Sequence, residues 1–162
     1  TEIYVVDVMD ARLKKAKELG ATKVINSRNE DIVEFAHSLP GGGVEQVYEC
    51  AGNRITTLQS CKLVKRYGKV TLVGVSPEPI LELDIGTANA MEATIYNVYR
   101  YRNTWSQAIS AVASGTIPVE KIVSHIFAFD DCINAIEYSL NHKDEVIKAV
   151  VSMVDKENKV LE

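Results

Sequence analysis

The stretch IYVVDVMDARLKKAKELGA, residues 3–21, sets the fold class of this chain. It begins with a short run rich in β-branched and aromatic residues, which is typical of a strand buried on both faces. Asp7 ends this run, Asp10 is a candidate N-cap, and apolar residues then recur at helical spacing as far as Gly20. The stretch therefore predicts a strand that leads directly into a helix.

The same alternation of strands and helices continues along the chain. Further extended segments are expected at residues 24–25, 44–50, 69–75, 94–99, 123–129 and 146–151, and further helices at 29–39, 53–66, 104–114 and from Asp130 or Asp131 to about Leu140. This alternation indicates a parallel sheet with helices on both faces. The expected fold is α/β and doubly wound over residues 1–152, with a polar tail at 153–162 that frays from Asp155 onward.

Composition argues against several classes of protein. The 162 residues suffice for one domain, and the net charge of −4 comes from Lys and Arg mixed with Asp and Glu, without a basic stripe for nucleic acid. No apolar run has the length of a transmembrane helix. The first residues lack the basic start and cleavage site of a signal peptide. We therefore expect a cytoplasmic protein without nucleic-acid or membrane partners.

The cysteines and histidines give no sign of a metal site or a disulfide framework, because their spacing matches neither. They are Cys50, Cys61, Cys132, His37, His125 and His142. Reduced thiols and no metal ligands within this chain are expected.

A strand that ends in an acidic residue and leads into a helix is the second β–α unit of a dinucleotide-binding, Rossmann-type fold. In that unit Asp7 would accept hydrogen bonds from the adenosine ribose and repel a 2′-phosphate, which favours NAD over NADP. Arg12 complicates this choice, because an arginine can receive that phosphate. The pattern equally allows Asp7 only to end the strand and cap the next segment.

The glycine-rich turn G-x-G-x-x-G of this fold does not occur in the chain. It should lie about 20 residues before the acidic residue, and Asp7 is too near the start. Gly41-Gly42-Gly43 follows a helix and precedes a strand, the reverse of the order that directs amides at phosphate. We expect an incomplete sheet without its first strand, in which the strands at 3–6 and 47–50 close up or pair with another chain.

Two loops fall at expected strand ends, where open α/β sheets bind ligands. They are residues 50–53, with Gly52, and residues 73–76, with Gly74. Glycine there would let a flat ring approach the backbone, although a glycine that only makes a turn is equally consistent. An aromatic and basic cluster, YRYR at residues 99–102 with Tyr96 and Trp105, suits a hydroxyl-rich or anionic ligand, but by itself favours a subunit interface.

Several blocks of the chain resemble the zinc-dependent medium-chain dehydrogenases. Residues 7–21, ECAG at 49–52 and GKVTLVG at 68–74 are similar to blocks of that superfamily in the same order. YRYRNTW at 99–105 resembles the Phe-Arg-Tyr-x-Asn-Thr segment of its sorbitol (L-iditol, polyol) dehydrogenase branch, with Tyr99 in place of the usual Phe. The similarity runs from about Val5 to Val151.

The resemblance implies roles for individual residues. Residues matching Asp7 and Arg12 contact the adenosine ribose, and those matching Arg100 and Tyr101 reach the substrate. Further cofactor contacts are expected in the two loops and at the end of the strand that precedes Arg100. They are Cys50, Ala51, Gly52, Val73, Gly74, Val75, Val98, Tyr99 and Arg100. Residues matching 73–75 lie beside the nicotinamide.

The activity implied is oxidation of a secondary hydroxyl of a polyol to a ketone with hydride transfer to NAD. In the family a zinc ion polarises the alcohol oxygen, but its ligands belong to an N-terminal catalytic domain. We therefore expect a C-terminal cofactor-binding portion, with zinc and the catalytic residues outside this chain and no turnover by the chain alone. The strand at residues 94–99 resembles the edge through which family members dimerise, which predicts a homodimer or homotetramer.

Two alternatives remain. The chain could belong to a threonine or simple alcohol dehydrogenase of the same superfamily, although the Arg100-Tyr101 block argues against this. It could also be a non-catalytic α/β module that binds a nucleotide or only oligomerises.

Overall fold

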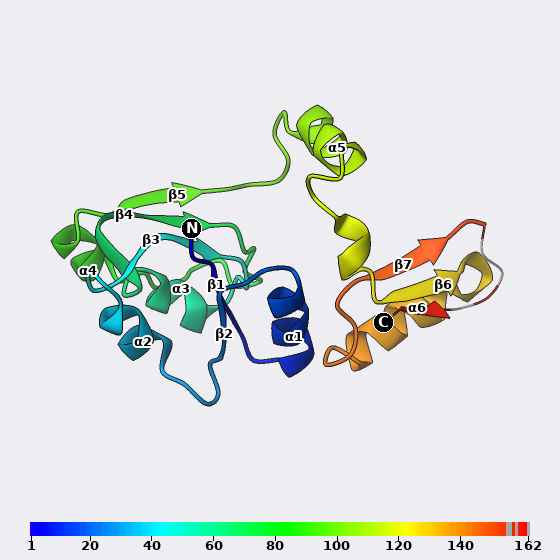
Figure 1. Cartoon of the computed structure of the whole chain (residues 1–162), viewed down its shortest axis with the longest axis horizontal. Coiled ribbons are helices and arrows are strands. Elements are labelled where there is room, and N and C mark those ends of the chain that lie inside the picture. The colour runs from blue at the N-terminus through cyan, green and yellow to red at the C-terminus, as the bar shows by residue number, and fades with distance from the viewer. Residues whose placement is uncertain (155–156, 158, 162) are drawn as a thin grey trace. The chain divides into compact units, whose positions relative to one another are not determined.

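The computed structural model describes residues 1–154, 157 and 159–161. The chain divides into two compact units, each described by itself. Unit 1 combines Thr1–Asn29 with Asn103–Glu162, and unit 2 is the continuous segment Glu30–Arg102. Helices and strands alternate along both units, as the labels in Figure 1 show. The α/β fold class with parallel strands is therefore confirmed.

Unit 2 is a three-stranded parallel sheet in the order β3-β4-β5, with short helices between the strands. Its elements are α2 (Ile32–Ser38), β3 (Val44–Glu49), α3 (Arg54–Ser60), β4 (Val64–Leu72), α4 (Ile85–Ala90) and β5 (Thr94–Asn97). Cys61, Val64, Val70 and Ala88 form its buried core. Because all three strands run the same way, their carboxyl ends meet at one edge of the sheet.

Two elements of unit 2 differ from the sequence-based expectation. The helix expected to reach residue 66 ends at Ser60, and β4 begins at Val64 instead of residue 69. Tyr67 adopts a left-handed φ of 62°, and the register of β4 against β3 shifts in the same region. The second difference is α4, which lies between the expected strands at 69–75 and 94–99, where no helix is predicted, and begins where Asp84 accepts a hydrogen bond from the Thr87 amide.

Unit 1 holds two further sheets. In one, β1 (Tyr4–Asp7) pairs in parallel with β2 (Lys23–Asn26), and α1 (Asp10–Glu18) connects them. The other has the order β7-β6-β8, in which β8 is antiparallel to β6. The remaining elements are α5 (Trp105–Ala113), η1 (Val119–Ile122), β6 (His125–Ala128), η2 (Phe129–Asp131), α6 (Cys132–Asn141), β7 (Ala149–Ser152) and β8 (Lys159–Val160).

The strands of unit 1 correct three expectations. Within the described residues β1 and β3 belong to separate sheets, so the expected closing up of these strands is wrong, and pairing with another chain stays a prediction. The first strand is not buried on both faces, because Val6 is 39% exposed. In the expected frayed tail, residues 159–160 form β8, while Asp155, Lys156, Asn158 and Glu162 lie outside the described residues.

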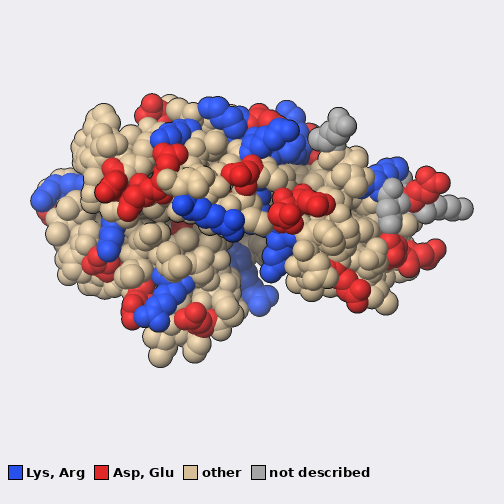
Figure 2. All heavy atoms as spheres, turned by 90° about the horizontal axis from the view of Figure 1, so that it is seen from below, with Lys and Arg blue, Asp and Glu red and all other residues tan. Residues whose placement is uncertain are grey.

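The distribution of charged side chains and the length and polarity of the helices agree with what the composition indicates. On the face drawn in Figure 2, Lys and Arg side chains are interspersed with Asp and Glu. Every helix in the described part of the chain is too short or too polar to cross a membrane.

Candidate functional site

Asp7 lies at the carboxyl end of β1, where its carboxylate organises the turn into α1. Its Oδ1 accepts hydrogen bonds from the amides of Val8 and Met9 at 2.7 and 2.9 Å. The expected N-cap is wrong, because Asp10 is the first helical residue and its Oδ1 instead accepts a hydrogen bond from Asn26. Capping of the strand exit by Asp7, one of the two interpretations left open, is therefore observed.

The second oxygen of Asp7 faces Arg12. Its Oδ2 lies 3.7 Å from Arg12 Nη1, and the two side chains remain 27% and 43% exposed. A partly exposed ion pair of this kind leaves both groups accessible to a ligand, and it partly neutralises the guanidinium. The pair leaves the predicted ribose contact sterically open, and the contact itself stays a prediction.

Glu49 connects the two loops at the carboxyl ends of β3 and β4. It is only 5% exposed. Its Oε1 accepts hydrogen bonds from the amides of Ala51 and Gly52, both at 2.9 Å, and from Thr56 Oγ1 at 2.7 Å. Its carbonyl oxygen accepts from the amides of Val73 and Gly74 at 2.8 and 2.9 Å. One residue thus holds both predicted loops.

Gly52 and Gly74 face each other across these loops. A Cβ atom built on Gly74 would lie 2.2 Å from the nitrogen of Gly52 and 2.6 Å from its Cα. A Cβ atom on Gly52, whose φ is +64°, would lie 2.7 Å from the carbonyl oxygen of Val75. Close packing of the two loops therefore accounts for both glycines, whatever ligand they also approach.

A pocket of about 350 Å³ opens at this edge of unit 2, beside the ends of β3, β4 and β5. Four predicted cofactor contacts line it, namely Gly74, Val75, Val98 and Tyr99. The others that line it are Glu49, Thr57, Leu72, Ser76, Glu78, Pro79, Leu81 and Asn97. The predicted contacts Cys50, Ala51, Gly52, Val73 and Arg100 are not among the lining residues. The pocket combines an apolar wall with carboxylates and amide groups, which suits a planar ligand with polar substituents.

The segment after β5 places Arg100 against Tyr99. The guanidinium lies 5.2 Å from the centre of the Tyr99 ring, a cation–π contact, and Arg100 has a left-handed φ of 60°. The Tyr99 and Tyr101 side chains are exposed, at 72% and 64%. Contact of Arg100 and Tyr101 with a substrate stays a prediction.

Cys50 follows Glu49 directly at the end of β3. Burial, and then the charge of Glu49, raise the pKa of its thiol, so the thiol stays protonated near neutral pH. Among the residues that the structure describes, no three His, Cys, Asp or Glu side chains gather to hold a metal ion. The described residues therefore do not fit a zinc site.

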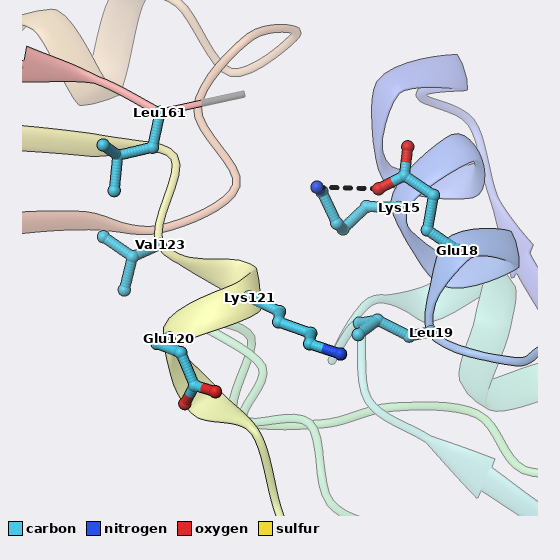
Figure 3. Close-up of a pocket in the computed structure, with 7 residues that line it drawn as sticks. All are labelled: Lys15, Glu18, Leu19, Glu120, Lys121, Val123 and Leu161. Atoms are coloured by element: carbon cyan, nitrogen blue, oxygen red, sulfur yellow. Dashed lines mark ion pairs between the residues drawn. The ribbon is translucent and has the colours of Figure 1, made fainter.

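Unit 1 has a separate hollow of about 330 Å³ beside α1 and η1 (Figure 3). The Lys15–Glu18 ion pair, at 2.7 Å, lies on its α1 side. Glu120 and Lys121 come from η1, so the hollow carries equal numbers of acidic and basic groups. It contains no predicted site residue.

Glu49 belongs to the block at residues 49–52 but is not among the residues predicted to contact the cofactor. The available signal was an acidic residue at the end of a strand, as at Asp7, although the strand before Glu49 also contains Glu45 and Gln46. Ser76 and Asn97 also line the pocket. They lie in the predicted loop at 73–76 and the predicted strand at 94–99, but no sequence pattern marks either as a binding residue.

Comparison with known proteins gives consistent matches. The profile of a family described as zinc-binding dehydrogenase matches residues 1–114. An uncharacterised zinc-type alcohol dehydrogenase-like protein of Escherichia coli is 39% identical over 96% of this chain and 44% of its own length. Sorbitol dehydrogenase of Bacillus subtilis is 31% identical over 92% of this chain and 42% of its own length. The chain thus spans less than half of these relatives.

Solved structures agree with the sequence matches. An Escherichia coli oxidoreductase of unknown specificity superposes with a TM-score of 0.84 and 37% identity, covering 94% of this chain and 44% of that one. A zinc-binding dehydrogenase of Sinorhizobium meliloti, solved with NADP, has a TM-score of 0.76 at 26% identity over 84% of this chain and 41% of its own. An Escherichia coli alcohol dehydrogenase, solved with NADH, has a TM-score of 0.82 at 25% identity over 94% and 45%.

Proposed function

The chain belongs to the zinc-binding dehydrogenase family, and on this premise we propose that it is the cofactor-binding part of an enzyme that oxidises a secondary hydroxyl of a polyol to a ketone with hydride transfer to NAD. The observation that carries the proposal is the pocket at the carboxyl ends of β3, β4 and β5, lined by Gly74, Val75, Val98 and Tyr99. Ligands bind at this edge in open parallel sheets. The similarity to sorbitol dehydrogenases, including the rat enzyme at 33% identity, supports a polyol substrate.

In this proposal NAD would contact the chain at two places. Asp7 and Arg12 would hold the adenosine ribose, since both are partly exposed at the end of β1. Gly74 and Val75 would lie beside the nicotinamide, with Val98 and Tyr99 on the β5 side of the pocket. Bound NAD supplies a nicotinamide ring that accepts a hydride from the carbinol carbon. The apolar side chains of Leu72, Val75 and Val98 would exclude water from that ring.

Zinc has no place among the described residues. We therefore assign activation of the alcohol to residues outside this chain and expect the chain alone to show no turnover. The outcome that contradicts this is NAD reduction by the purified chain with a polyol. We also assign the protein to the cytoplasm, where its free cysteines Cys50, Cys61 and Cys132 would stay reduced.

The preference for NAD over NADP rests on the carboxylate of Asp7. Its Oδ2 is partly exposed, and Arg12, which could otherwise attract a 2′-phosphate, is already paired with it. Relatives of known structure contain either NADP or NADH, so the fold alone does not decide between them. A fixed negative charge at the ribose opposes the phosphate of NADP by electrostatic repulsion.

The test is a titration of the full chain with NADH and with NADPH, in which binding is measured by the fluorescence of the nicotinamide. We expect NADH to bind at least about tenfold more tightly, equivalent to about 1.4 kcal/mol. Asp7→Ser should bring the two affinities together, whereas Asp10→Ser, which removes a neighbouring carboxylate bonded to Asn26, should not. Tighter binding of NADPH, or an unchanged ratio in Asp7→Ser, contradicts the proposal. Weak or absent binding by the chain alone that is recovered in a longer protein of the family would still favour the dehydrogenase, whereas absence of binding in both would favour a module that only oligomerises.

The substrate class is tested in a protein that joins this chain to a zinc-bearing catalytic half of the family. We expect NADH to form with sorbitol and other polyols and not with threonine or ethanol. Substituting Arg100→Ala should raise the KM for the polyol, because a guanidinium suits a hydroxyl-rich ligand. Activity with threonine or simple alcohols alone would select the alternative branch of the superfamily.

We further propose that the chain forms a homodimer or homotetramer through β5. This strand ends the β3-β4-β5 order, and Tyr96 on it is about half exposed. An edge strand with exposed aromatic residues favours pairing with another copy. Sedimentation of the chain is expected to show a dimer or tetramer that Ile95→Pro, which removes a backbone donor on β5, converts to monomers, and a wild-type monomer at high concentration contradicts this.

A further inference from the structure

Glu49 is a buried carboxylate whose hydrogen bonds all lead to backbone or side-chain groups of the candidate site. Oε1 takes its hydrogen bonds from the amides of Ala51 and Gly52 and the hydroxyl of Thr56. These three donors are uncharged, and hydrogen bonds from neutral donors to a carboxylate are stronger than those to a neutral acceptor. The carboxylate therefore fixes the loop between β3 and α3.

The backbone of the same residue fixes the second loop. Its carbonyl oxygen accepts from the amides of Val73 and Gly74, directly after β4 ends at Leu72. A shift of Glu49 would therefore move both loops together. The β3–β4 ladder stops at the pairing of Glu49 with Leu72, so these two hydrogen bonds hold the loop where the ladder no longer does.

The carboxylate also lies against the face of Gly74. The position of a Cβ atom on Gly74 would be 2.8 Å from Glu49 Oε2, and the same position would overlap the backbone of Gly52. Glu49, Gly52 and Gly74 thus form one closely packed group, here called the Glu49 clamp. Glu49 and Gly74 from this clamp both line the pocket.

We propose that Glu49 is a positioning residue that holds the Gly74–Val75 wall of the pocket in place and thereby sets the affinity for the nicotinamide half of the cofactor. The inference rests on the proposed function, since it assumes that this pocket receives the nicotinamide. The Glu49 side chain acts on Gly74 and Val75 through the loop that it holds, because Gly52 in that loop packs against both residues. Its effect should therefore appear with ligands that fill the pocket and not with ligands that lack a nicotinamide.

The test compares NADH with ADP-ribose, which lacks the nicotinamide, in the full chain. Glu49→Ala leaves three donors without their acceptor, so we expect NADH binding to weaken by about tenfold or more, and ADP-ribose binding to change by less than about twofold. Glu49→Gln keeps a carbonyl oxygen that can accept the same hydrogen bonds, so it should restore most of the affinity. Glu45→Ala is the matched control, because Glu45 lies on the same strand with an exposed side chain paired with Lys65.

A second measurement tests whether Glu49 holds the two loops in the absence of any cofactor. In hydrogen exchange, Glu49→Ala should lose protection at the amide of Gly52, whose acceptor is the carboxylate. The amide of Gly74 keeps its main-chain acceptor, so it should lose less protection, through the loosened packing of Gly52 against it, while the amide of Val70, in the middle of β4, stays protected. Equal weakening of NADH and ADP-ribose binding would overturn the inference, because Glu49 would then act only on overall stability. Unchanged exchange at both Gly52 and Gly74 would also overturn it, because the carboxylate would then not hold these loops. If the wild-type chain binds ADP-ribose and not NADH, the pocket assignment in the proposed function fails, and the exchange result alone decides whether Glu49 positions the loop.

Discussion

Replacing Gly74 with alanine adds one methyl group at the closest approach of two loops. The new Cβ atom would lie 2.2 Å from the nitrogen of Gly52, 2.6 Å from its Cα and 2.8 Å from Glu49 Oε2. None of these atoms is the free end of a flexible side chain, because Glu49 is held by three hydrogen bonds through its other oxygen. The methyl group can be accommodated only if the two loops separate.

The energetic cost arises from that separation. Overpacking of a well-packed site costs about 1–3 kcal/mol, and we expect Gly74→Ala to lie near the upper end, at about 3 kcal/mol, since relief requires backbone movement and loss of hydrogen bonds to Glu49. Gly74 is not among the residues with a positive φ, so backbone strain in the alanine variant contributes little. The effect is therefore almost entirely steric.

Urea unfolding followed by circular dichroism measures this cost as the change in the free energy of unfolding. Gly86→Ala is the control, because Gly86 lies in α4 and a Cβ there would meet only Asp84 Oδ1 at 3.6 Å, an ordinary contact. This control should stabilise the chain by about 0.5 kcal/mol, since alanine restricts the unfolded chain more than glycine. If Gly74→Ala and Gly86→Ala proved equally stable, the close packing of the two loops would not be a constraint in solution.

Three further changes test local features. Asn53→Ala removes the oxygen that accepts hydrogen bonds from two amides at the start of α3, so the free energy of unfolding should fall by about 1 kcal/mol in urea; an unchanged value would contradict the cap. The amide and hydroxyl of Thr87 lower the pKa of Asp84 from its ordinary 3.8, so ionised Asp84 stabilises the fold above that pH, and the contribution is lost as the pH falls through the lowered value. Asp84→Asn should remove this part of the acid sensitivity, and unfolding curves with the same acid dependence in both proteins would refute it. Burial and the charge of Glu49 raise the pKa of Cys50, so iodoacetamide should label it slowly at neutral pH and faster as the pH rises, as read by mass spectrometry; rapid labelling at neutral pH would argue against this environment.

Local periodicity predicted most elements, and it failed where a boundary depended on tertiary structure. The β1-α1-β2 unit was anticipated from residues 3–26, because its strands and helix are separated by Asp7 and Gly20. The end of α3 was not anticipated, because Leu63 and Val64 continue the helical spacing of apolar residues although the helix has already ended and β4 begins at Val64. The short helix α4 was missed because it makes less than two turns and comes after two prolines.

The candidate site was predicted in part. Gly74, Val75, Val98 and Tyr99 were identified from strand ends and family resemblance, and all four line the pocket. Glu49 was not singled out, because its importance comes from hydrogen bonds to residues 73 and 74, which are distant in the sequence. Periodicity indicates that a segment is a strand, but it does not identify its partner strand. Because the partner strands could not be identified, all strands were expected in one sheet, whereas the described residues form three separate sheets.

The division of the chain into a continuous unit and a discontinuous one has a consequence for the order of folding. Residues 30–102 contain every strand of the β3-β4-β5 sheet, so this unit can form its native pairs as soon as its own segment is synthesised. Unit 1 combines residues 1–29 with residues 103–162, and the entropy cost of closing a loop increases with its length. During translation, residues 30–102, which include the pocket, should therefore fold first, and unit 1 should form only once residues 103–162 have also been synthesised.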